Sequence, residues 1–175
     1  MTTFNSTLLK VMNVIFWIVF IGLCIKTGAI LISFLVTLFV NPDGAKNLYL
    51  GLDLFELYSI NKLYYVQTAS FLIALTGLKA FIAYFVVRFF LKFRLSKPFS
   101  TDLTDLFLKI SYFSVGAGIL AIIADGYNKW LLTKGIVVPI TWGSEEIIFF
   151  GGVIYIFALI FKKGTELQSE NDLTV

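Results

Sequence analysis

The sequence has no histidine, and Cys24 is its only cysteine. A disulfide within these residues is therefore impossible, and the usual zinc and haem ligand sets cannot be assembled. A serine or cysteine nucleophile finds no histidine to serve as its base, which excludes most hydrolase arrangements. We therefore expect no cofactor, no metal site and no catalytic residues.

Charge is also scarce. Only 14% of the 175 residues are charged and 58% are hydrophobic, with a mean hydropathy of +0.89. Soluble domains are nearer a quarter charged, so this composition indicates a membrane protein. The net charge of +3 is small and dispersed, and it gives no reason to expect direct nucleic acid binding. The length suits one domain.

Long apolar runs predict an all-α fold, a four-helix bundle forming a single transmembrane domain over residues 1–175. The expected helices span about 8–40, 64–92, 101–132 and 144–163, with a polar tail over 164–175. Roughly 20 apolar residues cross a bilayer, and the first run is too long for a signal peptide. Ser100 and Ser144 are the expected N-caps of the last two helices. Residues 45–63 are either a short interfacial helix or a membrane-hugging loop.

The basic residues predict the orientation. One side would hold seven of them and the other four: Lys10, Arg88, Lys92, Arg94, Lys97, Lys162 and Lys163 against Lys46, Lys62, Lys129 and Lys134. The positive-inside rule then places both termini in the cytoplasm. An aromatic belt is expected at the opposite ends, made by Tyr64, Tyr65, Tyr127, Trp130 and Trp142. We expect a multi-pass protein whose immediate partner is the lipid bilayer.

Several ionisable residues lie within the apolar runs or at their edges: Lys26, Lys79, Asp125, Glu145 and Glu146. Charges at such depth are costly, so each is by default a hypothesis about function. At about 1.5 Å per residue they fall in one layer in the outer half of the membrane. Two cations and up to three anions at matching depth predict mutual neutralisation.

Small and hydroxyl residues support an inward placement of two of these charges. Gly22, Ala29, Ser33 and Thr37 share a helical face with Lys26, and Ser114, Gly118 and Ala121 share one with Asp125. Other interpretations stay open, because a lysine stem can snorkel and Asp125 can reach the outer headgroups. Acidic residues in a first helical turn also suit the helix dipole. Cys24 is expected to be an inert packing residue, and Gly151-Gly152 a close contact or kink.

Two oppositely charged segments flank the cytoplasmic edge. The basic cluster is Arg88, Lys92, Arg94 and Lys97, and the acidic tail residues are Glu166, Glu170 and Asp172. The tail is either a disordered stub, a segment docked on the basic edge, or a docking peptide for a partner.

Three short motifs carry a resemblance over essentially the whole chain. They are Lys97-Pro98-Phe99-Ser100, Trp142-Gly143-Ser144-Glu145-Glu146 and the terminal Glu-Asn-Asp-Leu-Thr-Val. In these the sequence resembles the bacterial family catalogued as domain of unknown function 2975. The resemblance implies a four-helix integral membrane protein of bacteria with no established activity, and it supplies no catalytic residues. Members are often encoded beside a small helix-turn-helix regulator, which implies such a regulator as partner.

Two functional hypotheses follow. The leading one is a non-enzymatic sensing or regulatory membrane component that acts with a cytosolic partner. The alternative is a small transporter or an ion or proton conductor that uses the layer of buried charges. A membrane enzyme is disfavoured because no nucleophile–base pair or metal set is present. Composition leaves the ligand and the oligomeric state undetermined.

Overall fold

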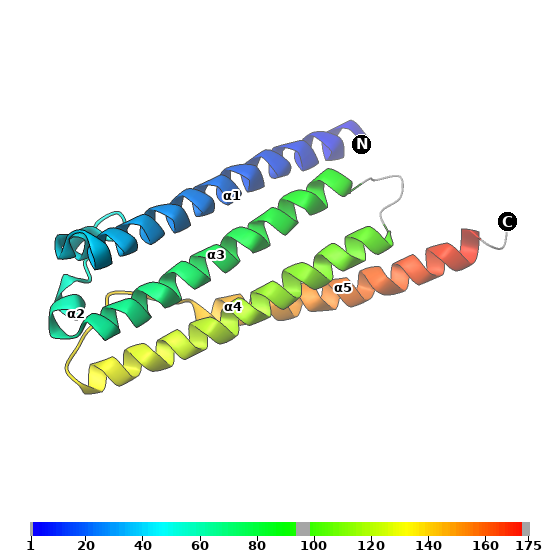
Figure 1. Ribbon diagram of the computed structural model, residues 1–175. Helices are drawn as coiled ribbons and strands as arrows, with labels where there is room; N and C mark the ends of the chain where they lie inside the picture. The colour runs from blue at the N-terminus through cyan, green and yellow to red at the C-terminus, as the bar shows by residue number, and fades with distance from the viewer. Residues whose placement is uncertain (1, 94–98, 173–175) are drawn as a thin grey trace.

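The computed structural model describes residues 2–93 and 99–172, and the side chains of residues 7–93 and 99–170. These residues form α1 (Thr2–Phe39), the 3-10 helix η1 (Pro42–Asn47), α2 (Phe55–Ile60), α3 (Lys62–Lys92), α4 (Thr101–Thr133) and α5 (Ser144–Asp172) (Figure 1). No strand occurs among them. The all-α expectation is confirmed for this part of the chain.

Among the described residues, four helices are long and apolar enough to cross a membrane: α1, α3, α4 and α5. The most apolar is α1, with a mean hydropathy of 2.4. Its residues Ile18, Ile25 and Ile32, each two helical turns from the next, are 66%, 63% and 63% exposed. An exposed isoleucine stripe of this kind marks a surface for contact with lipid or with another protein.

Local sequence signals explain where the helices begin and end. The Asn61 side chain accepts a hydrogen bond from the Leu63 amide at 2.8 Å and caps α3. The Ser100 hydroxyl accepts from the Leu103 amide at 3.4 Å, so its predicted role as the N-cap of α4 is confirmed. At the other end of α4, Gly135 adopts a φ of 78°. The Gly135 and Ile136 amides donate hydrogen bonds to carbonyl groups of the last turn of α4, as in a Schellman motif.

Two segments differ from the sequence expectation or refine it. Within residues 45–63 the chain forms α2, which matches the helical alternative. The last helix does not end at 163, because α5 continues through residues 164–172, most of the segment expected to be a polar tail. An i,i+3 ion pair between Lys163 and Glu166 at 3.1 Å supports this extension. Gly164 packs closely against the ring of Phe99.

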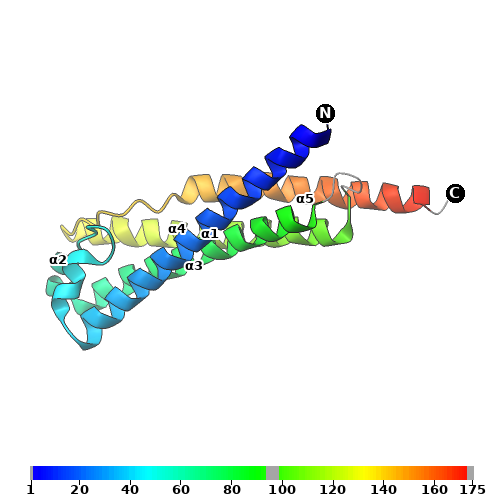
Figure 2. The same ribbon diagram turned by 90° about the horizontal axis from the view of Figure 1, so that it is seen from above.

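The long helices lie side by side in the order α1, α3, α4, α5. Close backbone contacts join α1 to α3, α3 to α4 and α4 to α5, whereas α1 makes none with α4 or α5 within the described residues. Figures 1 and 2 show α1 beside α3 and crossing the other helices obliquely. The bundle is therefore open between its first and last helices. The start of α1 and the end of α5 lie at one end of the molecule, and η1 and α2 lie at the other (Figure 1).

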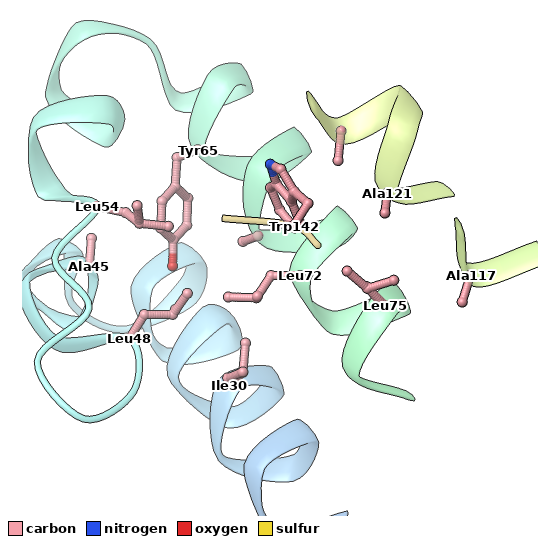
Figure 3. Close-up of a cluster of buried hydrophobic side chains, with 12 residues drawn as sticks. Ile30, Ala45, Leu48, Leu54, Tyr65, Leu72, Leu75, Ala117, Ala121 and Trp142 are labelled. Carbon is pink, nitrogen blue, oxygen red and sulfur yellow. The ribbon is translucent and has the colours of Figure 1, made fainter. Parts of the chain in front are cut away.

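The largest core cluster lies near the end of the molecule that carries η1 and α2 (Figure 3). Tyr65 and Trp142 lie in this cluster with 0% and 1% of their surface exposed. Both were expected in an exposed aromatic belt, and that expectation is wrong for these two residues. Tyr65 is covered because Leu48 and Leu54 of the segment around η1 pack into the same cluster.

Small residues bring α4 and α5 together. A Cβ atom on Gly118 would overlap Cγ1 of Ile148, and one on Gly151 would lie 3.0 Å from the Val115 backbone nitrogen. Ser114 and Ala121 are completely buried, so the predicted inward face of α4 is confirmed. The parallel expectation fails for Gly22 on α1, which is exposed and where an added Cβ atom would meet nothing within 4 Å. Cys24 is exposed rather than packed.

Candidate functional site

The start of α5 lies inside the bundle instead of at its end. The Ser144 hydroxyl donates a hydrogen bond to Asp125 Oδ2 at 2.5 Å, which places the first residue of α5 beside Asp125. From Asp125 to the last residue of α4, Thr133, the helix rises by about 12 Å. The irregular segment 134–143 must therefore return by that distance before α5 begins. Trp142, near the end of this segment, is only 1% exposed and anchors it in the core.

Ser144 was expected to cap α5 from the position before the helix. Instead Ser144 is the first residue of α5, and its hydroxyl donates a hydrogen bond to Asp125. The preceding residue, Gly143, has a φ of 68°, and its carbonyl accepts a hydrogen bond from the Ile147 amide at 3.2 Å. Glu145 and Glu146 occupy the first turn, as predicted. The Glu146 carboxylate lies over Gly143, where a Cβ atom would be 3.5 Å from Oε2.

Lys79 and Glu146 line one cavity of about 230 Å³ between α3, α4 and α5. The other lining residues are Ile82, Ser114, Ile147 and Phe150. Lys79 and Glu146 interact electrostatically, yet they are not among the ion pairs within 4.0 Å found in the described residues. The cavity therefore holds an ammonium and a carboxylate that face a common space without touching.

Lys26 on α1 lies near Lys79. The neighbouring residue Thr27 contacts α3 at Gly77, where a Cβ atom would be 3.9 Å from Thr27 Cγ2. Lys26 and Lys79 repel each other electrostatically. The Lys26 ammonium extends toward the η1 end of the molecule and lies 5.6 Å from the centroid of the Tyr49 ring. A cation–π contact of this kind partly compensates its charge.

The predicted charge layer is thus brought together only in part. Lys26, Lys79 and Glu146 interact, whereas Asp125 is hydrogen-bonded to Ser144. Glu145 is exposed and does not line the cavity. Direct mutual neutralisation is not observed in the described part of the chain, because Lys26 faces an aromatic ring and Asp125 a hydroxyl group.

The residues predicted for cytoplasmic contact find partners of their own. Lys92 pairs with Asp102 at 2.6 Å, and the Arg88 guanidinium lies 5.8 Å from the centroid of the Tyr84 ring. Glu166 pairs with Lys163 of its own helix. The two oppositely charged segments are therefore not joined through these residues. Glu170 is exposed on α5, Arg94 and Lys97 lie outside the described residues, and so does the side chain of Asp172.

Sequence reasoning missed the polar partners of this site. Ser144 was assigned to a cap and Trp142 to the belt, and neither was connected with Asp125 or the core. The sequence around Gly143 predicted the start of a helix. No local pattern indicated how deep in the bundle that helix would begin. In the part of the chain that the structure describes, no group of three potential metal-ligating side chains occurs. The arrangement can instead hold a small polar molecule between Lys79 and Glu146.

Comparison with protein-family models, curated proteins and solved structures finds no match. The resemblance noted above therefore stays a prediction.

Proposed function

We propose that this chain is a multi-pass protein of a bacterial plasma membrane, with both termini in the cytoplasm. Four long apolar helices support the membrane assignment. The start of α1, the end of α3 and the end of α5 lie at the same end of the molecule (Figure 1). Arg88 and Lys92 belong to the last two turns of α3, and Lys162 and Lys163 belong to the second half of α5. Basic residues near helix ends favour the cytoplasmic side. The bacterial origin rests on the family resemblance alone.

Labelling of single cysteines tests this topology, because replacing Cys24 by serine leaves no other cysteine. In that background we expect a membrane-impermeant maleimide to label Lys134→Cys in intact spheroplasts and Lys163→Cys only after permeabilisation. Both positions are exposed and lie at opposite ends of the helices. The reverse pattern would contradict the orientation. Labelling of both positions before permeabilisation would contradict a chain that spans the membrane four times.

Within the membrane, the chain acts as a non-enzymatic sensing or regulatory component that works with a cytosolic partner. The observation that carries this proposal is the α5 extension, residues 164–172. Its base is held by Thr165, whose Oγ1 lies 3.4 Å from Oγ1 of Thr104. Beyond that contact, Leu167 is 51% exposed beside the exposed Glu166. Helices that present apolar anchors in this way dock into grooves of partner proteins.

The family resemblance makes a small helix-turn-helix regulator the first partner to test. DNA binding would then belong to that regulator and not to this chain. A photo-crosslinking residue at Leu167 is expected to give one discrete adduct with a soluble protein in cells. The photo-crosslinking residue placed at Leu132 is the matched control and should give no adduct. Leu132 is 59% exposed and lies at the C-terminal end of α4, at the other end of the molecule from Leu167.

Adding Glu166→Lys to the photo-crosslinking variant is expected to abolish the adduct, because it reverses a charge beside the apolar anchor. Membrane insertion and expression level should not change, since both positions are exposed. An adduct that survives the charge reversal, or one formed with a membrane protein, would count against a cytosolic partner at this helix. Absence of any adduct at Leu167 would overturn the docking role.

The alternative, a transporter or conductor, receives less support from the geometry. A conduction path needs its ionisable groups to line one continuous route. Asp125 is bonded to Ser144 and Lys26 lies against Tyr49. Among the predicted charges, only Lys79 and Glu146 line the cavity described above. This arrangement favours binding in one place over passage through a series of sites.

A further inference from the structure

The cavity between α3, α4 and α5 separates two opposite charges that would ordinarily pair. Lys79 contributes an ammonium from α3, and Glu146 contributes a carboxylate from the first turn of α5. Neither is among the side chains that form a hydrogen bond or an ion pair within the described residues. Glu146 is exposed and Lys79 is half-buried, so both charged groups can be reached from outside the chain. The cavity therefore has an unused donor on one wall and an unused acceptor on another.

The charges of a ligand determine whether it can interact favourably with both Lys79 and Glu146. A lone anion would satisfy Lys79 and leave Glu146 uncovered beside a second negative charge. A lone cation would do the reverse, and Lys26 would add to its repulsion, because Lys26 already acts on Lys79. A ligand with one carboxylate and one ammonium covers both groups and adds no net charge at membrane depth. The separation of Lys79 and Glu146 thus favours a zwitterion over either ion.

Size and lining restrict the ligand further. The cavity measures about 230 Å³, below the roughly 300–1,000 Å³ typical of sites for drug-sized ligands. Ile82, Ile147 and Phe150 provide apolar walls for a short hydrocarbon body. Ser114 is completely buried and its hydroxyl donates to the Ile110 carbonyl at 2.7 Å, so Lys79 and Glu146 are the polar groups that the cavity offers a ligand.

We propose that this cavity binds a small zwitterion of the free amino acid class with an apolar side chain. Its carboxylate lies on Lys79 and its ammonium on Glu146. The inference deepens the sensing role proposed above, because it names the class of molecule that is sensed. Binding is measured on the isolated chain without a partner, so its failure is distinguishable from failure of the docking role at Leu167.

The test uses the full chain, purified in detergent or lipid nanodiscs, and isothermal titration calorimetry with three matched probes. They are L-leucine, 4-methylpentanoate, which lacks the ammonium, and 3-methylbutylamine, which lacks the carboxylate. L-Leucine is expected to bind saturably and to raise the unfolding temperature. Each of the other probes should bind at least about 10-fold more weakly, because each leaves one protein charge unsatisfied.

Two variants that each remove one charge are expected to change the preference between the two single-charge probes in opposite directions. Lys79→Met is expected to weaken L-leucine binding at least about 10-fold and to make 3-methylbutylamine the better of the two single-charge probes. Glu146→Gln should weaken L-leucine similarly and favour 4-methylpentanoate. Lys129→Met, which removes an exposed charge outside the cavity, is the matched control and should bind all three probes as the unmodified chain does.

Opposite changes in probe preference cannot arise from a general loss of structure. If both variants unfold, the three affinities of the unmodified chain decide the question by themselves. Absence of saturable L-leucine binding overturns the proposal, as do equal affinities for the three probes. Folded Lys79→Met and Glu146→Gln variants that bind L-leucine like the unmodified chain would also overturn it.

Discussion

Replacement of Gly118 by valine is expected to lower the free energy of unfolding by about 3 kcal/mol, the upper part of the range for overpacked interiors. A Cβ atom at this position would overlap Cγ1 of Ile148, and it would lie 3.2 Å from the Ile148 backbone nitrogen. Because backbone as well as side chain is in the way, α4 and α5 must move apart. Thermal unfolding of the purified protein in detergent, followed by circular dichroism, measures the effect.

Gly116 provides the matched control for this experiment. It lies on the same helix, and a Cβ atom there would have no neighbour within 4 Å. Gly116→Val should therefore change stability by no more than about 0.5 kcal/mol, as is usual for surface sites. Addition of Ile148→Ala to Gly118→Val should recover part of the loss, since it removes the overlapping side-chain atom. Equal effects at Gly116 and Gly118 would contradict the close contact of α4 with α5.

Replacement of Trp142 by alanine is expected to cost about 3–5 kcal/mol, the typical loss for a large aromatic residue removed from a core. Trp142 is 1% exposed, and its ring packs edge-on against Phe71 with centroids 6.3 Å apart. It also immediately precedes the turn into α5, so its loss frees the segment that sets the depth of Glu146. The readouts are thermal unfolding and tryptophan fluorescence, whose emission should lose its most blue-shifted component.

Trp130 is the control for this substitution, because it is the same residue type with 44% of its surface exposed. Trp130→Ala should cost less than about 1 kcal/mol. Trp142→Phe should fall between the unmodified chain and Trp142→Ala. A stability loss at Trp142 no larger than the small loss expected at Trp130 would contradict the anchoring of segment 134–143 in the core by Trp142.

The features that local sequence determined are those with local physical causes. Apolar runs longer than a membrane crossing specify the positions of the long helices, and the all-α fold follows from them. The Ser100 cap needs only an amide three residues away. The face of α4 that carries Ser114, Gly118 and Ala121 is set by helical periodicity, since small residues at that spacing permit close packing. These features could be predicted without knowledge of the neighbouring helices.

The features that only the tertiary structure decided depend on where distant segments meet. Hydropathy registers the length of a run but not its depth, so it could not show that α5 begins beside Asp125 or that Trp142 is buried. It likewise could not reveal that Lys26 turns to Tyr49 while Lys79 and Glu146 share a cavity. A charged side chain several ångströms long can reach more than one partner. Which partner it meets is fixed by the packing of the helices that carry them.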